Sequence, residues 1–174
     1  MSNVIVRDLK YLNEDALENI FAYCLRIEKD KLSDSKQSVI WGGNGLLLNT
    51  PQSAINSFIA IKSNYNKNLG NLLHHVIINL KCDKKISDLI SIAIEIGEKI
   101  GFDFFKKGFQ SAYFIHIKNG YVHIHLIVNS ISYMTGNRIN SSGWLGNNII
   151  SYLFLNYPHL KWEYNVIYNN ERYY

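Results

Sequence analysis

Three histidines that lie close together in the sequence have the residue type and spacing for metal chemistry. His116, His123 and His125 fall within one stretch, SAYFIHIKNGYVHIHLIVN, which spans residues 111–129. Neutral imidazoles are common ligands of divalent cations, and three such ligands leave coordination positions open, as catalytic rather than closed structural sites do. If the three rings converge, the spacing therefore predicts a metal site that can act on a substrate.

The same stretch predicts the element that brings the rings together. Asn119-Gly120 lies between two alternating apolar runs and favours a two-residue hairpin turn, because both residue types tolerate positive φ. This register places His116 opposite His123, with Cβ atoms about 4.5–5.5 Å apart, and His125 on the same face. A three-residue loop would turn His116 to the other face. In the two-residue register the opposite face receives Val122, Ile124, Leu126 and Val128.

A cation at such a site could act as a Lewis acid on a phosphodiester and hold it for in-line attack. The two cysteines of the chain, Cys24 and Cys82, form no CxxC pair, which argues against a zinc finger. They are also too few for a disulfide framework, so we expect a cytoplasmic protein in a reducing environment.

The remaining chain of 174 residues predicts one domain, spanning residues 1–174. Helical spacing and caps indicate helices over 14–27, from Thr50-Pro51 to about Tyr65, over 87–100 with Gly101 as the stop, and over 144–155. Alternating or apolar runs indicate strands over 74–81, 110–117, 121–129 and 161–168. Within 38–48 they indicate a short strand, a turn at the Gly-Gly-Asn-Gly of 42–45 and a second extended piece. The predicted class is α+β, a central antiparallel sheet with helices packed mainly on its faces.

Composition narrows the class of protein without naming a function. Hydrophobic residues make up 47% of the chain and charged residues 18%, which excludes a disordered or collagen-like protein. The longest apolar runs are shorter than the ~18 residues of a membrane span, and Met1 to Lys10 is too polar for a signal peptide. The net charge of +4 allows an anionic partner but does not require one.

At the histidines the sequence resembles the HUH motif of the relaxase/mobilisation nuclease superfamily of the MOBP type, from plasmids and integrative conjugative elements. That motif has a His, a short turn, His-x-His, apolar residues, an Asn and a Gly-Lys/Arg turn. The stretch HHVIINLK resembles the family's second motif, and similarity extends over about residues 14–168. The matching positions are His75, Asn79, His116, His123, His125, Asn129, Gly136 and Arg138.

The resemblance implies an HUH-endonuclease-like palm and a strand-specific DNA nickase that acts at an origin of transfer to start conjugative mobilisation. A tyrosine would attack the scissile phosphate and form a 5′-phosphotyrosyl link, with Mn²⁺ or Mg²⁺ bound by His116, His123 and His125. Tyr23, in NIFAYCLRIEKDK, stands where the first motif places the nucleophile, and Tyr11 is the alternative. The chain would be an excised nuclease domain or a minimal protein.

The implied partners are single-stranded and origin DNA, accessory relaxosome proteins and a coupling protein. For DNA binding the resemblance indicates His75, Asn79, Asn129 and Arg138, and Lys81 belongs to a set of lysines that could follow the phosphates. The chain departs from the family pattern at Lys118, where relaxases often carry an acidic residue, and at Asn79, where Ser is usual. An acidic residue at the first position would hold an imidazole tautomer, so another group is expected to do this.

Three other functions are compatible with the sequence. A rolling-circle replication initiator also uses His-x-His, with a later tyrosine; Tyr157 and Lys161 offer a loose version of that arrangement. A DNA-binding module of this fold could lack nicking activity, which the missing acidic residue permits. The third is a metal-dependent hydrolase of small substrates.

Overall fold

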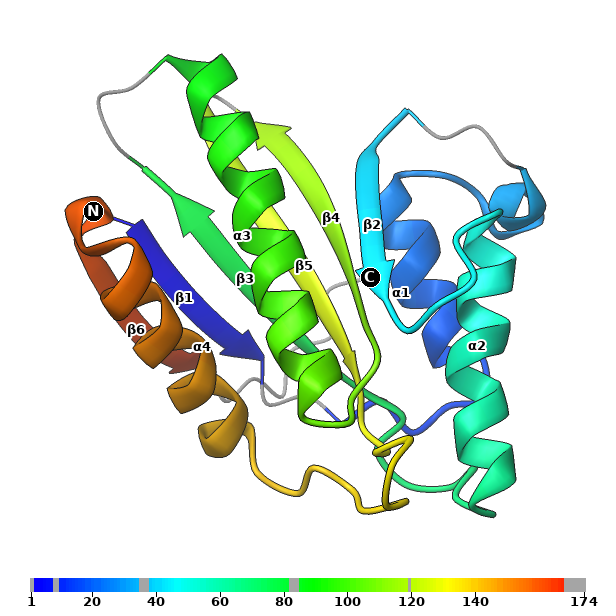
Figure 1. Ribbon diagram of the computed structural model, residues 1–174. Coiled ribbons are helices and arrows are strands. Elements are labelled where there is room, and N and C mark those ends of the chain that lie inside the picture. Colours follow the sequence, from blue (N-terminus) through cyan, green and yellow to red (C-terminus); the bar gives the residue numbers. More distant parts are fainter. Residues whose placement is uncertain (1, 8–9, 35–37, 82–84, 119, 168–174) are drawn as a thin grey trace.

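A single six-stranded sheet forms the centre of the computed structural model, which describes residues 2–7, 10–34, 38–81, 85–118 and 120–167 (Figure 1). The strand order is β2-β4-β5-β3-β1-β6. Neighbouring strands are antiparallel except β1 and β6, which are parallel. The strands are β1 (Ser2–Arg7), β2 (Ile40–Asn44), β3 (Leu73–Leu80), β4 (Ser111–Lys118), β5 (Tyr121–Asn129) and β6 (Trp162–Ile167).

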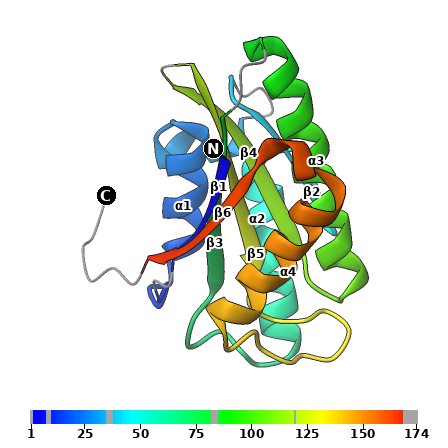
Figure 2. The same ribbon diagram turned by 90° about the vertical axis from the view of Figure 1, so that its left-hand side faces the viewer.

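Helices cover both faces of this sheet, which gives three layers (Figure 2). The helices are α1 (Ala16–Leu25), α2 (Pro51–Asn64), α3 (Ile86–Lys106) and α4 (Ser142–Asn156), with short 3₁₀ turns η1 (Lys29–Ser33) and η2 (Pro158–Leu160). α1 and α2 pack on one face, and α3 and α4 on the other. The predicted α+β class, with a mainly antiparallel sheet, is confirmed. Within the described ranges, we find no helix with the length and apolar character needed to cross a membrane.

Each face of the sheet has its own hydrophobic core, because successive side chains of a strand point to opposite faces. On β5, Val122, Ile124 and Leu126 join the core beneath α3 and α4. Ile127, one position further along, joins the smaller core beneath α1 and α2. The predicted inward face of this strand is therefore confirmed, and its alternate positions are directed toward α1.

The hairpin of β4 and β5 has the predicted register. Lys118 pairs with Tyr121, and His116 pairs with His123, which leaves two residues in the loop. Gly120 has φ of +79°, as such a turn requires. Asn119 and Cys82, both named in the sequence analysis, lie outside the described residues.

The predicted end of the third helix is wrong, because α3 continues through Gly101 to Lys106. A Cβ on Gly101 would lie 2.9 Å from Ser111 Oγ, so the glycine lets the helix lie close to β4. The chain turns instead at Gly108, which has φ of +90°. Packing against the sheet thus decides the helix length, whereas the sequence signal for a stop does not.

Gly42 and Gly43 begin the turn that was predicted within 38–48, but the structure places both in a strand. Gly42 pairs with Tyr113 and Gly43 with Ala112, so both lie inside β2 at the edge of the sheet. Pairing with β4 supplies the backbone hydrogen bonds that glycine's weak strand preference alone would not secure. The chain turns only after them, at Gly45, which has φ of +75°. The second extended piece predicted after the turn is wrong, because residues 46–48 form no strand.

Gly97 gives a test of the close packing of α3. A Cβ at this position would lie 2.7 Å from Cγ of the Tyr113 ring, which is held between helix and sheet. We expect Gly97→Ala to lower the free energy of unfolding by about 1–3 kcal/mol through overpacking. Urea unfolding followed by circular dichroism measures it. Gly143→Ala, in the first turn of α4 with only Ser141 Oγ at 3.4 Å, is the control and should be neutral or slightly stabilising. Equal stability of the two variants would contradict the packing argument.

Candidate active site

The three histidines of the motif lie on the sheet face that α1 covers. His116 on β4 is directly opposite His123 on β5, and His125 follows two residues later on the same face. The ring centroids of His116 and His125 are 4.3 Å apart. The structure therefore confirms that the three histidines share one face, while their role as metal ligands stays a prediction.

An amide row holds His123. This row crosses four neighbouring strands at paired positions: Asn3 on β1, Asn79 on β3, His123 on β5 and His116 on β4. His123 Nδ1 is hydrogen-bonded to Asn79 Oδ1, and Asn79 Nδ2 donates to Asn3 Oδ1 at 2.5 Å. Because an amide oxygen only accepts, Nδ1 of His123 carries the hydrogen and Nε2 keeps its lone pair. Asn79 thus performs the orienting task that the sequence analysis assigned to an unidentified group, since Lys118 has replaced the acidic residue.

The end of α1 holds His116. Its Nε2–H donates to the backbone carbonyl of Cys24 at 2.5 Å, because a carbonyl oxygen only accepts. Nδ1 of His116 therefore keeps its lone pair in the neutral ring. This contact joins β4 to the last turn of the helix that also carries Tyr23.

A third chain of hydrogen bonds leads from His125 into the interior. His125 Nδ1 lies 2.9 Å from His75 Nε2, and His75 Nδ1 lies 3.3 Å from the Tyr11 hydroxyl. The two rings are stacked at 5.2 Å. His75 was predicted to contact DNA; it is 1% exposed and lies beside His125 on the neighbouring strand β3, so its contact with DNA stays a prediction.

Burial keeps the imidazoles of this cluster uncharged. Removal from water lowers the pKa of His75, His116, His123 and His125 below the ordinary value, and it is the largest cause for each. Neighbouring positive charges, Arg7 for His75 and Arg26 for His116, lower the pKa further. Neutral rings are the form that binds a cation, so the site offers nitrogen lone pairs near pH 7.

Two tyrosines reach this cluster and a third does not. The Tyr23 ring on α1 lies edge-on to His125, with centroids 5.7 Å apart, and is 49% exposed. The Tyr11 hydroxyl contacts His75, and burial raises the pKa of Tyr11 to about 12. Tyr157 is buried in the core on the opposite face, where its hydroxyl donates to Glu95.

A model of the relaxase family, described as the MobA/VirD2-like nuclease domain, matches residues 23–150, about three quarters of the chain. The chain belongs to this family. The matched segment begins at Tyr23 and contains all three motif histidines. Membership implies endonuclease activity on DNA. No curated protein and no solved structure matches the chain significantly.

Two of the residues predicted to bind DNA in this relaxase domain also hold its own structure. Asn129 is fully buried, and its Nδ2 donates to Phe58 O and Gln110 Oε1. Arg138 donates hydrogen bonds to the carbonyls of Lys67, Leu69 and Asn71, and these bonds stabilise the loop before β3. Their contact with DNA stays a prediction.

Lys81 has the exposure that phosphate binding needs. It lies directly after β3, and its Nζ is 5.2 Å from the centre of the Tyr121 ring on β5. Asn79, predicted to bind DNA as well, is two residues away and partly buried in the amide row. The contact of either residue with DNA stays a prediction.

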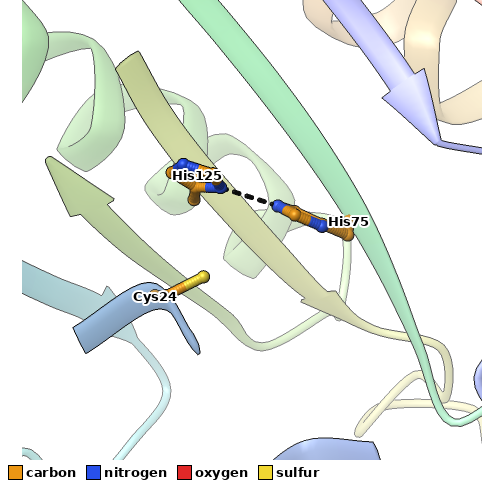
Figure 3. Close-up of side chains that lie close together, drawn as sticks. All are labelled: Cys24, His75 and His125. Carbon is orange, nitrogen blue, oxygen red and sulfur yellow. Dashed lines mark hydrogen bonds between the residues drawn. The ribbon is translucent and has the colours of Figure 1, made fainter. Parts of the chain in front are cut away.

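Two potential ligands, Cys24 and His75, were not predicted as metal ligands from the sequence of this relaxase domain. Within the described residues, the three potential ligand atoms found within 4.8 Å of one another belong to Cys24, His75 and His125 (Figure 3). His125 therefore belongs both to this group and to the predicted set with His116 and His123. Neutral nitrogen donors around one space fit a divalent cation. Cys24 lies on the buried face of α1, but only tertiary packing brings its thiol to the histidines.

The buried imidazoles predict that the metal-free relaxase domain loses stability in acid. The pKa of His75 and His125 is lowered in the folded state, so below about pH 6.5 the unfolded chain binds more protons. Stability is fully present above that pH, and at pH 5.5 each of these two rings should cost about 1.4 kcal/mol. Urea unfolding of chelator-treated protein at pH 7.5, 6.5 and 5.5 measures the loss. His75→Gln should reduce the loss, whereas His159→Gln should not; a pH-independent midpoint would contradict the burial.

The amide row predicts a specific effect of Asn79. In metal-free protein, nitrogen-detected NMR should find His123 as the Nδ1–H tautomer, and Asn79→Ala should release it to a mixture. Loss of such an orienting partner typically weakens metal binding 10–100-fold, so calorimetry with Mn²⁺ should show weaker binding. Asn79→Asp should keep the tautomer, and Asn156→Ala, on α4, is the control. An unchanged tautomer in Asn79→Ala would show that this hydrogen bond does not set it.

Proposed function

We propose that this domain cuts one strand of DNA at an origin of transfer, with Tyr23 as the nucleophile. The observation that carries the proposal is the position of Tyr23: its ring is half exposed and lies 5.7 Å from the ring of His125. A phenol at this edge can be reached by a strand from solvent. It also adjoins the face on which His116, His123 and His125 lie.

The reaction is a transesterification. The Tyr23 oxygen forms a bond to phosphorus while the bond from phosphorus to the 3′ oxygen breaks, which leaves a 5′-phosphotyrosyl link and a free 3′-hydroxyl. The phenol loses its proton, for which the exposed side chain has access to water, and the departing 3′ oxygen gains one. The link conserves the phosphodiester bond energy, so a 3′-hydroxyl can later reseal the strand.

His116, His123 and His125 are the residues we assign to the divalent cation. Mn²⁺ or Mg²⁺ held by these rings would supply Lewis-acid stabilisation of charge on the scissile phosphate. The contacts of the rings support the assignment: Cys24 O orients His116, Asn79 orients His123, and His75 contacts His125. Burial lowers the pKa of the rings and so keeps them uncharged near pH 7.

In this proposal the reaction starts conjugative mobilisation of a plasmid or an integrative conjugative element. Residues 1–174 form one nuclease domain in the cytoplasm, and its substrate is single-stranded DNA at the origin. Accessory relaxosome proteins and a coupling protein are the expected protein partners. Lys81 and the other predicted DNA contacts would direct the strand toward Tyr23.

A DNA-binding module without nicking activity is the second candidate, because Lys118 and Asn79 stand where relaxases more often carry an acidic residue and Ser. The rolling-circle initiator is less well supported. Its candidate nucleophile Tyr157 is 7% exposed and lies on the face of the sheet opposite the histidines.

Covalent adduct formation tests the proposal. Purified protein, Mn²⁺ or Mg²⁺ and single-stranded oligonucleotides that tile an origin of transfer should give a protein–DNA adduct that survives denaturing electrophoresis. Tyr23→Phe should abolish the adduct because it lacks the nucleophilic oxygen, and His123→Ala should reduce it strongly. Tyr157→Phe, which changes the opposite face, is the matched control and should retain it.

Each other outcome identifies a competing assignment. An adduct that persists in Tyr23→Phe but is lost in Tyr11→Phe would move the nucleophile to Tyr11. Loss only in Tyr157→Phe would support the initiator. Tight binding of the oligonucleotides with no adduct under any of these conditions would support the module without nicking activity.

A further inference from the structure

The cluster of Cys24, His75 and His125 contains donors that the proposed reaction does not use. Cys24 comes from the last turn of α1, His75 from β3 and His125 from β5 (Figure 3). β3 and β5 are paired neighbours, with Ile77 opposite His125 and His75 opposite Ile127. The two histidines are therefore diagonal neighbours on one face. The thiol of Cys24 faces them from the helix above.

All three side chains are withdrawn from solvent: Cys24 is 0% exposed, His75 1% and His125 4%. Their ligand atoms lie within 4.8 Å of one another. Cys24 is a free cysteine, so its thiol is not in a disulfide. The space thus brings one sulfur and two nitrogen donors together.

A sulfur and two imidazole nitrogens favour a different cation from the one proposed for catalysis. Thiolate and imidazole suit Zn²⁺ and Co²⁺, whereas Mg²⁺ and Mn²⁺ prefer oxygen ligands. Two donors on one tetrahedral zinc ion are about 3.3–3.6 Å apart, given Zn–N near 2.0–2.1 Å and Zn–S near 2.3 Å. Ligand atoms as far apart as 4.8 Å would therefore need to approach one another by about 1–1.5 Å.

We propose that Cys24, His75 and His125 form a second cation site, selective for thiophilic divalent ions such as Zn²⁺, that competes with the catalytic ion for His125. Binding exchanges the thiol proton of Cys24, released to solvent, for a sulfur–metal bond and breaks the hydrogen bond between His75 and His125. Since the three donors leave a position open, water completes the coordination.

The competition follows from geometry and rests on the proposed function. His125 belongs to both sets, and its ring is 4.3 Å from that of His116, so an ion on either set draws this ring from the other. Tyr23 lies edge-on to the same ring. Zn²⁺ in the second site would therefore disassemble the catalytic ligand set beside the nucleophile and stop nicking.

Cobalt spectroscopy tests the site without any measurement of activity. Co²⁺ is added to metal-free protein that carries Cys82→Ser, so that Cys24 is the sole remaining thiol. We expect a near-ultraviolet sulfur-to-cobalt charge-transfer band that Zn²⁺ abolishes. A folded protein that binds Co²⁺ without this band, or shows no Co²⁺ binding, would overturn the proposal.

Three variants in the same background assign the ligands. Cys24→Ser, which is close in size, and His75→Gln should each lose or strongly shift the band, with circular dichroism to confirm folding. His123→Ala is the matched control: it removes a histidine of the catalytic set and should leave the band unchanged. Loss of the band in His123→Ala would show that Cys24 joins the catalytic ion instead of forming a second site.

The competition has its own readout. If Mn²⁺ supports the DNA adduct, stoichiometric Zn²⁺ should suppress the adduct in the wild-type protein, and excess Mn²⁺ should restore it. An adduct unaffected by Zn²⁺ under conditions where Zn²⁺ abolishes the cobalt band would overturn the competition. If no metal supports an adduct, the proposed nicking function fails, while the cobalt band still decides whether the thiophilic site exists.

Discussion

The alternation of side chains along β5 is the constraint on which the site depends. Val122, Ile124 and Leu126 are fully buried beneath α3 and α4, and the residues between them, His123 and His125, are turned to α1. A shift of register by one residue would place the imidazoles in the apolar core and the aliphatic side chains in the site. The hydrophobic core on one face therefore holds the chemistry on the other face in place.

Packing of α1 completes the site. Phe21 contacts Phe58 and Phe114 edge to face, with centroids 6.0 and 5.2 Å apart, and this anchors the helix to α2 and β4. Tyr23, two residues later, therefore falls at the border between the sheet and solvent. The same helix presents Cys24, whose carbonyl binds His116 and whose thiol faces His75 and His125. One helix thus positions the candidate nucleophile, an orienting carbonyl and the donor of a second cation site.

The imidazoles are oriented by neutral partners. His123 is held by an Asn79 amide, His116 by a backbone carbonyl, and His125 by another imidazole. Positive charges on Arg7, Arg26 and Lys118 contribute to the lowered pKa of the rings. An amide orients a ligand without adding negative charge, so cation binding here gains less from electrostatics than with a carboxylate. A nearby DNA phosphate would supply the negative charge that these neutral partners do not provide.

Local patterns in the sequence determined the α+β class, the hairpin register and the alternation that places His116, His123 and His125 on one face. These features depend on neighbours within one hairpin, where turn type and side-chain period are decisive. The length of α3, the contact of Cys24 with the histidines, the orienting role of Asn79 and the structural hydrogen bonds of Arg138 required the tertiary structure. Each of these features depends on contacts between segments that are far apart in the chain. The packing of the helices on the sheet therefore determines them, and local sequence preferences do not predict them.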